Sequence, residues 1–282
     1  MPDPMDRPAR DGGREQTGGR TARGWVTVGM VALVAVVVGA FALGRATSST
    51  TSKPAAASAE LSRASVTTTS TTAPGVNVDE LLENVPDQPL SPATRAKLAS
   101  QLVAARAAAL QYPTVASARA AGMIQAGGFA PLLGAHFISY TNLNRELLPD
   151  GSIDPRYPAG FIYDGIDPTS KIVGLMFVSI KGGAAPAGFA GPNDHWHRHS
   201  NLCIQYGANN KISVPFAPDR DVTKAQCDAV HGDFMPKTVW MVHAWVVPGW
   251  ESPKGVFSHE DPDLLCADGT SKANAVGFCK GT

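Results

Sequence analysis

An uncharged, apolar stretch of twenty residues near the N-terminus is the feature that most restricts the folds open to this chain. It reads WVTVGMVALVAVVVGAFALG and occupies residues 25–44. At a rise of about 1.5 Å per residue, a helix of this length spans the roughly 30 Å hydrocarbon core of a bilayer. A buried core helix is the alternative, but the polar, Gly-rich residues before it could not cover such a segment. We therefore predict a transmembrane helix over residues 25–44.

The charges on either side of this stretch predict its orientation. Five arginines precede it, whereas residues 45–75 carry only Arg45, Lys53 and Arg63. This excess of positive charge keeps the N-terminus in the cytoplasm and sends the rest of the chain across the membrane. Cleavage after Ala42 is the alternative, because Ala-Phe-Ala at residues 40–42 suits signal peptidase. Under both interpretations the C-terminal part lies outside the cytoplasm, either anchored to the cell membrane or secreted.

Composition divides the chain into four parts. Residues 1–24 are rich in Gly, Arg and Asp and lack hydrophobic periodicity, which predicts a disordered cytoplasmic tail. After the apolar stretch, residues 45–76 form a Ser/Thr/Ala-rich tract with proline, which is typical of a linker. Residues 77–282 hold 16 basic and 19 acidic residues, a balance that argues against a nucleic-acid partner. We predict that they form one extracytoplasmic globular domain, because this length can bury one substantial core.

Hydrophobic periodicity within this domain changes from helical to extended along the chain. Ser91 and Pro92 signal the start of a helix that Pro113 ends, and Thr114 starts a short second helix that stops at Gly122. Strand patterns follow at residues 161–163, 171–180, 195–206, 211–214 and 238–247, with a short helix at 221–230. Helices followed by strands predict an α+β fold, with N-terminal helices packed on a mostly antiparallel sheet or a small, partly closed barrel.

All four cysteines lie in the predicted domain: Cys203, Cys227, Cys266 and Cys279. An even count in an exported chain predicts two disulfides. Three pairings are possible, and the sequence does not choose among them; we favour nearest neighbours, Cys203 with Cys227 and Cys266 with Cys279. Oxidised in this way, the sulfurs would not serve as metal ligands or nucleophiles.

Alternating histidines are the strongest chemical signal in the sequence. His195, His197 and His199 form the run HWHRH, so an extended chain projects three imidazoles from one face, about 6 to 7 Å apart. His136 and His243 each lie in an apolar run that would hold a ligand rigidly. With thiols excluded, imidazoles suit Zn²⁺, Cu²⁺ or Fe²⁺ better than Ca²⁺ or Mg²⁺. We predict a transition-metal site formed by His136, His195, His197 and His243, with His199 as a further candidate.

Structural roles for the same side chains are the alternative. A single core histidine, such as His136 or His243 taken alone, is more often a hydrogen-bonded structural residue than a ligand. The two remaining histidines, His231 and His259, lie in expected loops, where we predict solvated side chains. These two residues are therefore not among the predicted metal ligands.

No catalytic residue is predicted, and functions other than metal binding stay open. The sequence has no Gly-x-Ser-x-Gly elbow, no Walker-type phosphate loop and no His-Glu-x-x-His motif. A metal-free module could bind a protein or polysaccharide of the cell envelope through Trp196, Trp240, Trp245 and Trp250. A hydrolase that uses a histidine as base without metal is a further alternative.

Short motifs in a fixed order also resemble those of a protein family. They are Tyr-Pro-Thr-Val at residues 112–115, Ala-His-Phe-Ile at 135–138, Asp-Gly-Ser-Ile-Asp-Pro at 150–155, His-Ala-Trp at 243–245 and Ser-Pro-Lys-Gly-Val-Phe at 252–257. The series covers most of residues 100–260 and resembles a family of exported bacterial proteins of unknown function. The resemblance implies one domain and gives motif positions to His136, to one histidine of the 195–199 run and to His243. It implies no reaction.

Overall fold

A computed structural model of the chain describes residues 78–81, 86–143, 145–181, 183–207 and 212–282. The predicted tail, transmembrane helix and linker, residues 1–76, lie outside these ranges. Within the described ranges, the search for a helix of sufficient length and apolar character to cross a bilayer found none.

A single antiparallel sheet dominates the described part of the domain. Its strands are β1 (Val78–Leu81), β2 (Ile124–Ala130), β3 (Gly134–Ile138), β4 (Gly160–Tyr163), β5 (Ile172–Ser179), β6 (His197–Tyr206), β7 (Ile212–Ser213), β8 (Asp233–Lys237) and β9 (Trp240–Ala244). The order across the sheet is β1-β6-β9-β5-β4-β3-β2, and β7 and β8 both pair with β6. Every pairing between these strands is antiparallel. The prediction of a mostly antiparallel sheet is therefore confirmed.

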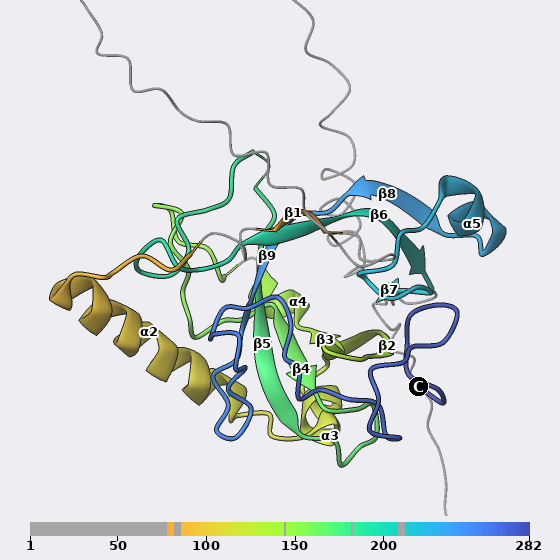
Figure 1. The fold of residues 1–282 in the computed structure, drawn as a ribbon, viewed down its shortest axis with the longest axis horizontal. Helices are drawn as coiled ribbons and strands as arrows, with labels where there is room; N and C mark the ends of the chain where they lie inside the picture. The colour runs from red at the N-terminus through yellow and green to blue at the C-terminus, as the bar shows by residue number, and fades with distance from the viewer. Residues whose placement is uncertain (1–77, 82–85, 144, 182, 208–211) are drawn as a thin grey trace, which may run out of the picture. The chain divides into compact units, whose positions relative to one another are not determined.

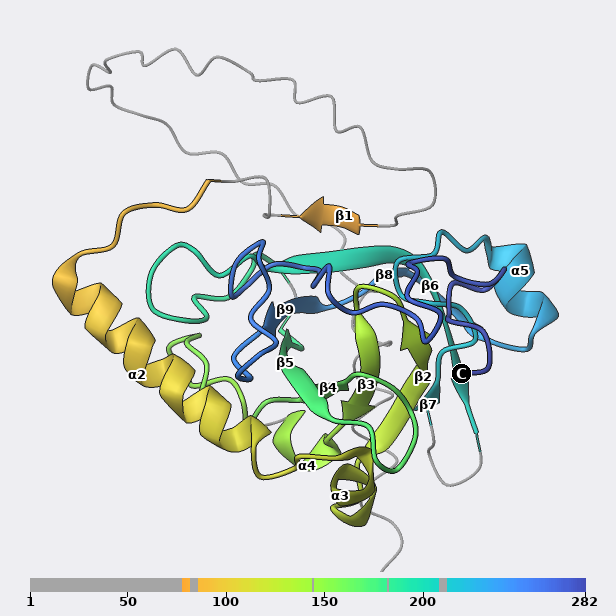
Figure 2. The ribbon, with the colours of Figure 1, turned by 60° about the horizontal axis from the view of Figure 1, so that its bottom comes forward.

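The sheet curls into a nearly closed barrel. Figure 2 shows β2, β3, β4, β5, β9 and β6 curving around a common interior. Strand β7 pairs with β6 and also contacts β2, so it brings the two sides of the sheet close together. Positions on one face of the strands consequently point into the barrel, and the alternating positions point outward.

Few helices accompany the barrel, as the sequence predicts. They are α2 (Pro92–Ala109), α3 (Val115–Ala120), α4 (Tyr140–Leu143) and α5 (Lys224–Ala229). The Ser91 side chain accepts a hydrogen bond from the Thr94 N–H at the start of α2, and Thr114 and Ser117 form a capping box at the start of α3. Helix α2 lies along the outside of the barrel beside β5 (Figure 1).

Aromatic side chains form the core between the helices and the outer face of the sheet. Phe137, Phe161 and Leu175 are register partners on neighbouring strands, and all three are buried. The Phe161 ring packs edge-on against Tyr112, which follows α2, at a centroid distance of 5.2 Å. Arg119 of α3 lies over the Phe137 ring. The helices therefore cover the outward-pointing residues of β3, β4 and β5.

Two disulfides join segments near the ends of the barrel. Cys203 of β6 pairs with Cys227 of α5, and Cys266 pairs with Cys279 in the C-terminal segment. This is the nearest-neighbour pairing that we favoured. No cysteine in the described part of the chain has a free thiol.

One boundary differs from the prediction in a way that affects the site. The sequence indicates a strand from residue 195, but β6 begins at His197. The backbone N–H of Trp196 instead donates a hydrogen bond to the Asp194 carbonyl, and its indole N–H donates one to the Asp194 carboxylate, both at 2.8 Å. His195 therefore precedes the strand and does not follow its alternation.

A buried carboxyl group lies between the α4 segment and the sheet. Glu146 is fully buried, and its Oε2 accepts a hydrogen bond from the Ala159 N–H at 3.0 Å. Burial raises the pKa of Glu146 to about 9, although backbone N–H groups of Val178 and Ala159 act in the opposite direction. At neutral pH the folded protein therefore holds this side chain as a neutral acid.

Replacing Glu146 with glutamine tests this assignment through the pH dependence of stability. The folded-state pKa lies above the unfolded value of 4.5, so the stability that Glu146 contributes is complete below pH 4.5 and is lost as pH rises toward 9. Between pH 5 and 8.5, the free energy of unfolding of Glu146→Gln, measured with denaturant, should rise relative to that of wild type by up to about 1.4 kcal/mol per pH unit. The exposed Glu251→Gln variant controls for the loss of a carboxylate. A constant difference between Glu146→Gln and wild type across this range would contradict the assignment.

Candidate metal centre

Five histidines gather inside the barrel, although they come from distant parts of the sequence. His136 lies in β3, His197 and His199 in β6, His243 in β9, and His259 in the loop that follows β9. Their exposed fractions are 9% for His136, 0% for His197, and 2% for each of the other three. We call these five residues the histidine cluster.

Strand register explains why the strand-borne histidines meet. His197 lies directly opposite Met241, which is two residues before His243 on β9 and so shares its face. His243 lies opposite Met176 of β5, and His136 lies opposite Ile162 of β4. Directly paired residues project from the same side of a sheet. Antiparallel register therefore places these imidazoles on the face opposite the aromatic core.

Within the cluster, three histidines form a group with the spacing of metal ligands. One ring nitrogen from each of His197, His199 and His259 lies within 4.8 Å of the others. The His197 ring touches both partners edge-on, with centroid distances of 5.4 Å to His199 and 4.4 Å to His259. These three buried side chains, which we call the histidine triad, are close enough to hold a metal ion.

The other two histidines form a pair next to the triad. Nε2 of His136 and Nε2 of His243 are 3.4 Å apart. Contacts between rings connect the pair to the triad, since the His243 ring stacks on His259 at 5.7 Å and packs edge-on against His197 at 5.1 Å. The pair and the triad thus make up one continuous group of imidazoles.

Burial keeps four histidines of the cluster, His136, His197, His243 and His259, uncharged. Loss of water lowers the pKa of His136 to about 4 and that of His243 to about 3. The same desolvation, added to by the neighbouring histidines, lowers the pKa of His197 and of His259 well below the usual value. Neutral imidazole is the form that binds a metal ion. At physiological pH these side chains are therefore in their metal-binding state.

His243 and His197 differ in the hydrogen bonds that their rings make. His243 donates its Nδ1–H to the backbone carbonyl of His259 at 2.7 Å, which leaves the Nε2 lone pair directed toward His136. This is the usual support for a metal-binding histidine. Neither ring nitrogen of His197 makes a hydrogen bond of normal geometry within the described residues, although the side chain is completely buried. Burying a polar ring in this way destabilises the fold unless something else binds it.

A folded loop carries His259 into the cluster, and here the prediction of a solvated side chain is wrong. Indole Nε1 of Trp245 donates to the Ser258 carbonyl at 2.8 Å, and Ser258 Oγ donates to Ser252 Oγ at 2.9 Å. Ser258 and Asp261 are also buried. Polar, Pro-containing sequence around His259 indicates an exposed loop, whereas its hydrogen bonds to the end of β9 turn the loop inward. The other expected loop residue, His231, is exposed as predicted.

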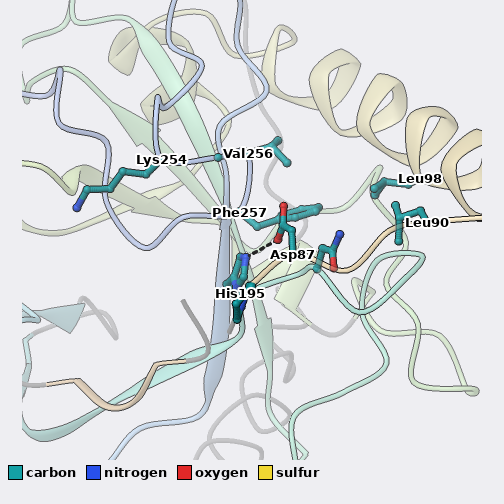
Figure 3. Close-up of a pocket in the computed structure, with 10 residues that line it drawn as sticks. Asp87, Leu90, Leu98, His195, Lys254, Val256 and Phe257 are labelled. Carbon is teal, nitrogen blue, oxygen red and sulfur yellow. Dashed lines mark hydrogen bonds and ion pairs between the residues drawn. The ribbon is translucent and has the colours of Figure 1, made fainter. Parts of the chain in front are cut away.

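His195 lies apart from the cluster, in a surface pocket. Its Nε2 is 3.0 Å from Oδ1 of Asp87, as Figure 3 shows. The pocket has a volume of about 360 Å³, and Phe257 and Lys254 also line it. Lys254 extends away from the His195–Asp87 pair and forms an ion pair with Glu260 at 2.8 Å. None of the residues that line this pocket is a serine, threonine or cysteine. The pocket therefore offers a histidine with a carboxylate but no hydroxyl or thiol nucleophile.

A smaller cavity borders the cluster inside the barrel. Its volume is about 120 Å³, and it is lined mainly by apolar side chains. The polar part of its wall comes from three cluster residues, His136, His199 and His243. Met176 and Met241 lie in the same wall. This cavity places imidazole nitrogens and thioether sulfurs next to one small space.

The tryptophans do not form an exposed binding surface. Trp196, Trp240 and Trp245 are buried, with exposed fractions of 1%, 6% and 1%, and Trp250 is partly buried. Trp240 donates its indole N–H to the Gly183 carbonyl at 2.8 Å. These rings pack in the core, which counts against the alternative of a binding module that recognises its partner through them.

Two histidine variants should respond oppositely in the metal-free protein. His197→Leu removes a buried ring that makes no hydrogen bond to the described part of the chain, so chemical denaturation in EDTA should show stability equal to or above that of wild type. His243→Leu removes the donor to the His259 carbonyl and should lower stability by about 1 to 3 kcal/mol. An equal loss in both variants would show that His197 has a structural role like that of His243.

Comparisons of the chain with models of protein families, with curated proteins and with solved structures gave no match. The resemblance to exported bacterial proteins noted above accordingly stays a prediction.

Proposed function

We propose that this chain is a membrane-anchored protein whose extracytoplasmic domain binds a transition metal ion through the histidine cluster. The observation that carries the proposal is His197, which is fully buried, uncharged and without a hydrogen bond to any described residue, yet touches three other imidazoles. An apolar residue would fill this position at lower cost in free energy. A metal ion supplies the missing interaction.

The histidine triad is the ligand set for this ion. Its three imidazoles come from two neighbouring positions on β6 and from the loop after β9, so the barrel and the loop fix them from two sides. Three imidazoles leave a fourth position for water or another molecule if the ion is tetrahedral. An open position of that kind is what distinguishes a catalytic metal from a purely structural one.

The chemistry of the donors restricts the metal. Imidazole suits zinc, copper and iron, whereas calcium and magnesium prefer oxygen ligands. No carboxylate belongs to the triad group found among the described residues. Thiolates are excluded, because the four cysteines form disulfides. We infer a divalent transition metal, with zinc, copper and iron as the candidates.

Sequence and disulfides support the extracytoplasmic location. Residues 25–44 have the length and composition of a membrane-spanning helix, and the arginines before them favour a cytoplasmic N-terminus. Disulfides persist in oxidising compartments. Signal cleavage after Ala42 would give a secreted domain with the same site.

Metal analysis of the full-length chain, produced without a polyhistidine tag and purified in mild detergent, tests this function. After growth with zinc, copper and iron, we expect about one equivalent or more of transition metal per chain. His197→Leu should lose the triad-bound ion. His195→Asn and His231→Asn should keep it, because neither residue belongs to the cluster. Asparagine suits position 231, where the backbone has a positive φ of 56°.

Thermal unfolding provides the second readout of the same experiment. When the free concentration of the ion is 100 times its dissociation constant, binding stabilises the folded state by about 2.7 kcal/mol. Chelation should therefore lower the melting temperature of wild type. In protein loaded with zinc alone, it should leave the melting temperature of His197→Leu unchanged. Sub-stoichiometric metal in wild type, together with a melting temperature that chelators do not alter, would contradict the proposal.

A further inference from the structure

We propose that the other end of the cluster is a separate, softer site, in which His136 and His243 together with Met176 and Met241 bind copper(I). It shares the cluster with the metal-binding function proposed above but uses different ligand atoms. The proposal stands on the spacing of the two histidines, on the register that pairs histidine with methionine, and on the cavity that all four residues line.

The distance between the paired histidines fits a shared ion better than a hydrogen bond. Their Nε2 atoms are 3.4 Å apart, which is long for a hydrogen bond, since N–H···O bonds have lengths of about 2.7 to 3.2 Å. Two nitrogens bound at about 2.0 to 2.1 Å to a tetrahedral ion lie roughly 3.3 to 3.4 Å from each other. The hydrogen bond from His243 Nδ1 to the His259 carbonyl keeps a lone pair on the Nε2 that faces His136. The pair is therefore arranged as two ligands of one ion.

Each methionine is the direct cross-strand neighbour of a cluster histidine. Met176 of β5 lies opposite His243 of β9, and Met241 of β9 lies opposite His197 of β6. Directly opposed residues have Cβ atoms about 4.5 to 5.5 Å apart and project from the same face. The thioethers consequently lie on the inner face of the barrel, beside the imidazoles.

A glycine makes room for one of these thioethers. Gly160 of β4 is the register partner of Met176, and a Cβ atom at Gly160 would come within 2.9 Å of both Cβ and Cε of Met176. Any larger residue would therefore displace the Met176 side chain. The missing side chain at Gly160 of β4 thus leaves the space that Met176 occupies.

The cavity inside the barrel brings the four donors to one place. His136, His243, Met176 and Met241 all line it, and its volume of about 120 Å³ is ample for an ion. Most of the remaining wall is apolar. An ion of single charge is easier to place in such surroundings than a divalent one, because the cost of removing an ion from water rises steeply with its charge.

Thioether sulfur selects the metal. Methionine is a soft ligand that favours copper(I), whereas zinc binds mainly to imidazole, thiolate and carboxylate. Two imidazoles and two thioethers make a neutral ligand set, and they leave the site with the single positive charge of the cuprous ion. The chemical class of ligand is therefore a monovalent, soft transition-metal ion.

Leucine replaces methionine at nearly constant volume, so variants can remove the sulfurs and keep the packing. We would load the full-length chain with copper(I) under ascorbate, which leaves the disulfides intact, and compare wild type with the Met176→Leu/Met241→Leu double variant. Met123→Leu is the matched control, because Met123 is buried in the main core and does not line the cavity. Competition with a chromophoric chelator gives the copper(I) affinity, and competition with a zinc chelator gives the zinc affinity.

The double variant should bind copper(I) at least about tenfold more weakly than wild type and the Met123→Leu control, with unchanged zinc affinity. X-ray absorption at the copper edge should show copper–sulfur scattering in wild type and none in the double variant. Because the cysteines are paired in disulfides, such scattering can come only from methionine. His197→Leu should keep copper(I) and lose the ion of the triad.

Three results would overturn the proposal, and the first two would leave the function proposed above intact. Equal copper(I) affinity in wild type and the double variant, or a wild-type copper spectrum without sulfur, would refute the thioether site while leaving the triad as a metal site. A wild-type chain that binds none of copper, zinc and iron would refute both. Copper(I) binding that survives in His197→Leu but is lost in the double variant would support the second site on its own.

Discussion

The antiparallel register of β3, β4, β5 and β9 places an aromatic core on one face of the sheet and imidazoles on the other, and the rest of the domain depends on this register. A slip by one residue would exchange the two faces and bury the histidines under the helices. Each apolar ring buried on the outer face contributes about 1.5 to 3 kcal/mol. The buried His197 imidazole, which makes no hydrogen bond to the described residues, works in the opposite direction. The packing of α2 and α3 on the sheet therefore offsets the free-energy cost of burying polar imidazole rings inside the barrel.

A costly interior is the usual mark of a binding site. Natural proteins depart from well-packed, fully hydrogen-bonded cores mainly where function requires it. In this domain the departures coincide: the neutral rings of His136 and His243, the His197 ring that makes no hydrogen bond to the described residues, and the cavity lie together inside the barrel. The surface pocket around His195 lacks this combination, since its histidine already has a carboxylate partner. Physical arguments thus point to the interior of the barrel as the functional centre.

The sequence correctly predicted features that depend on residues close together in the chain. Caps such as Thr114 marked the helices, and alternation on β6 predicted that His197 and His199 share a face. Features set by long-range packing escaped prediction. Strand β8 was not predicted and contains Pro236; among the described strands it pairs with β6 alone, and such an edge strand tolerates proline. His259 joined the cluster through hydrogen bonds between its loop and β9, a contact that no spacing along the chain announces.

The loop that carries His259 also bears on the speed of exchange. The His259 carbonyl accepts the bond from His243, the Ser258 carbonyl accepts the bond from Trp245, and the Val256 carbonyl accepts the backbone N–H of Trp245. These bonds tie the segment to the end of β9 while its imidazole serves the triad. If the proposed ion occupies the triad, withdrawing His259 from it requires local opening that breaks several of these bonds together. We therefore expect a kinetically inert site, whose ion is retained far longer than equilibrium affinity alone would suggest.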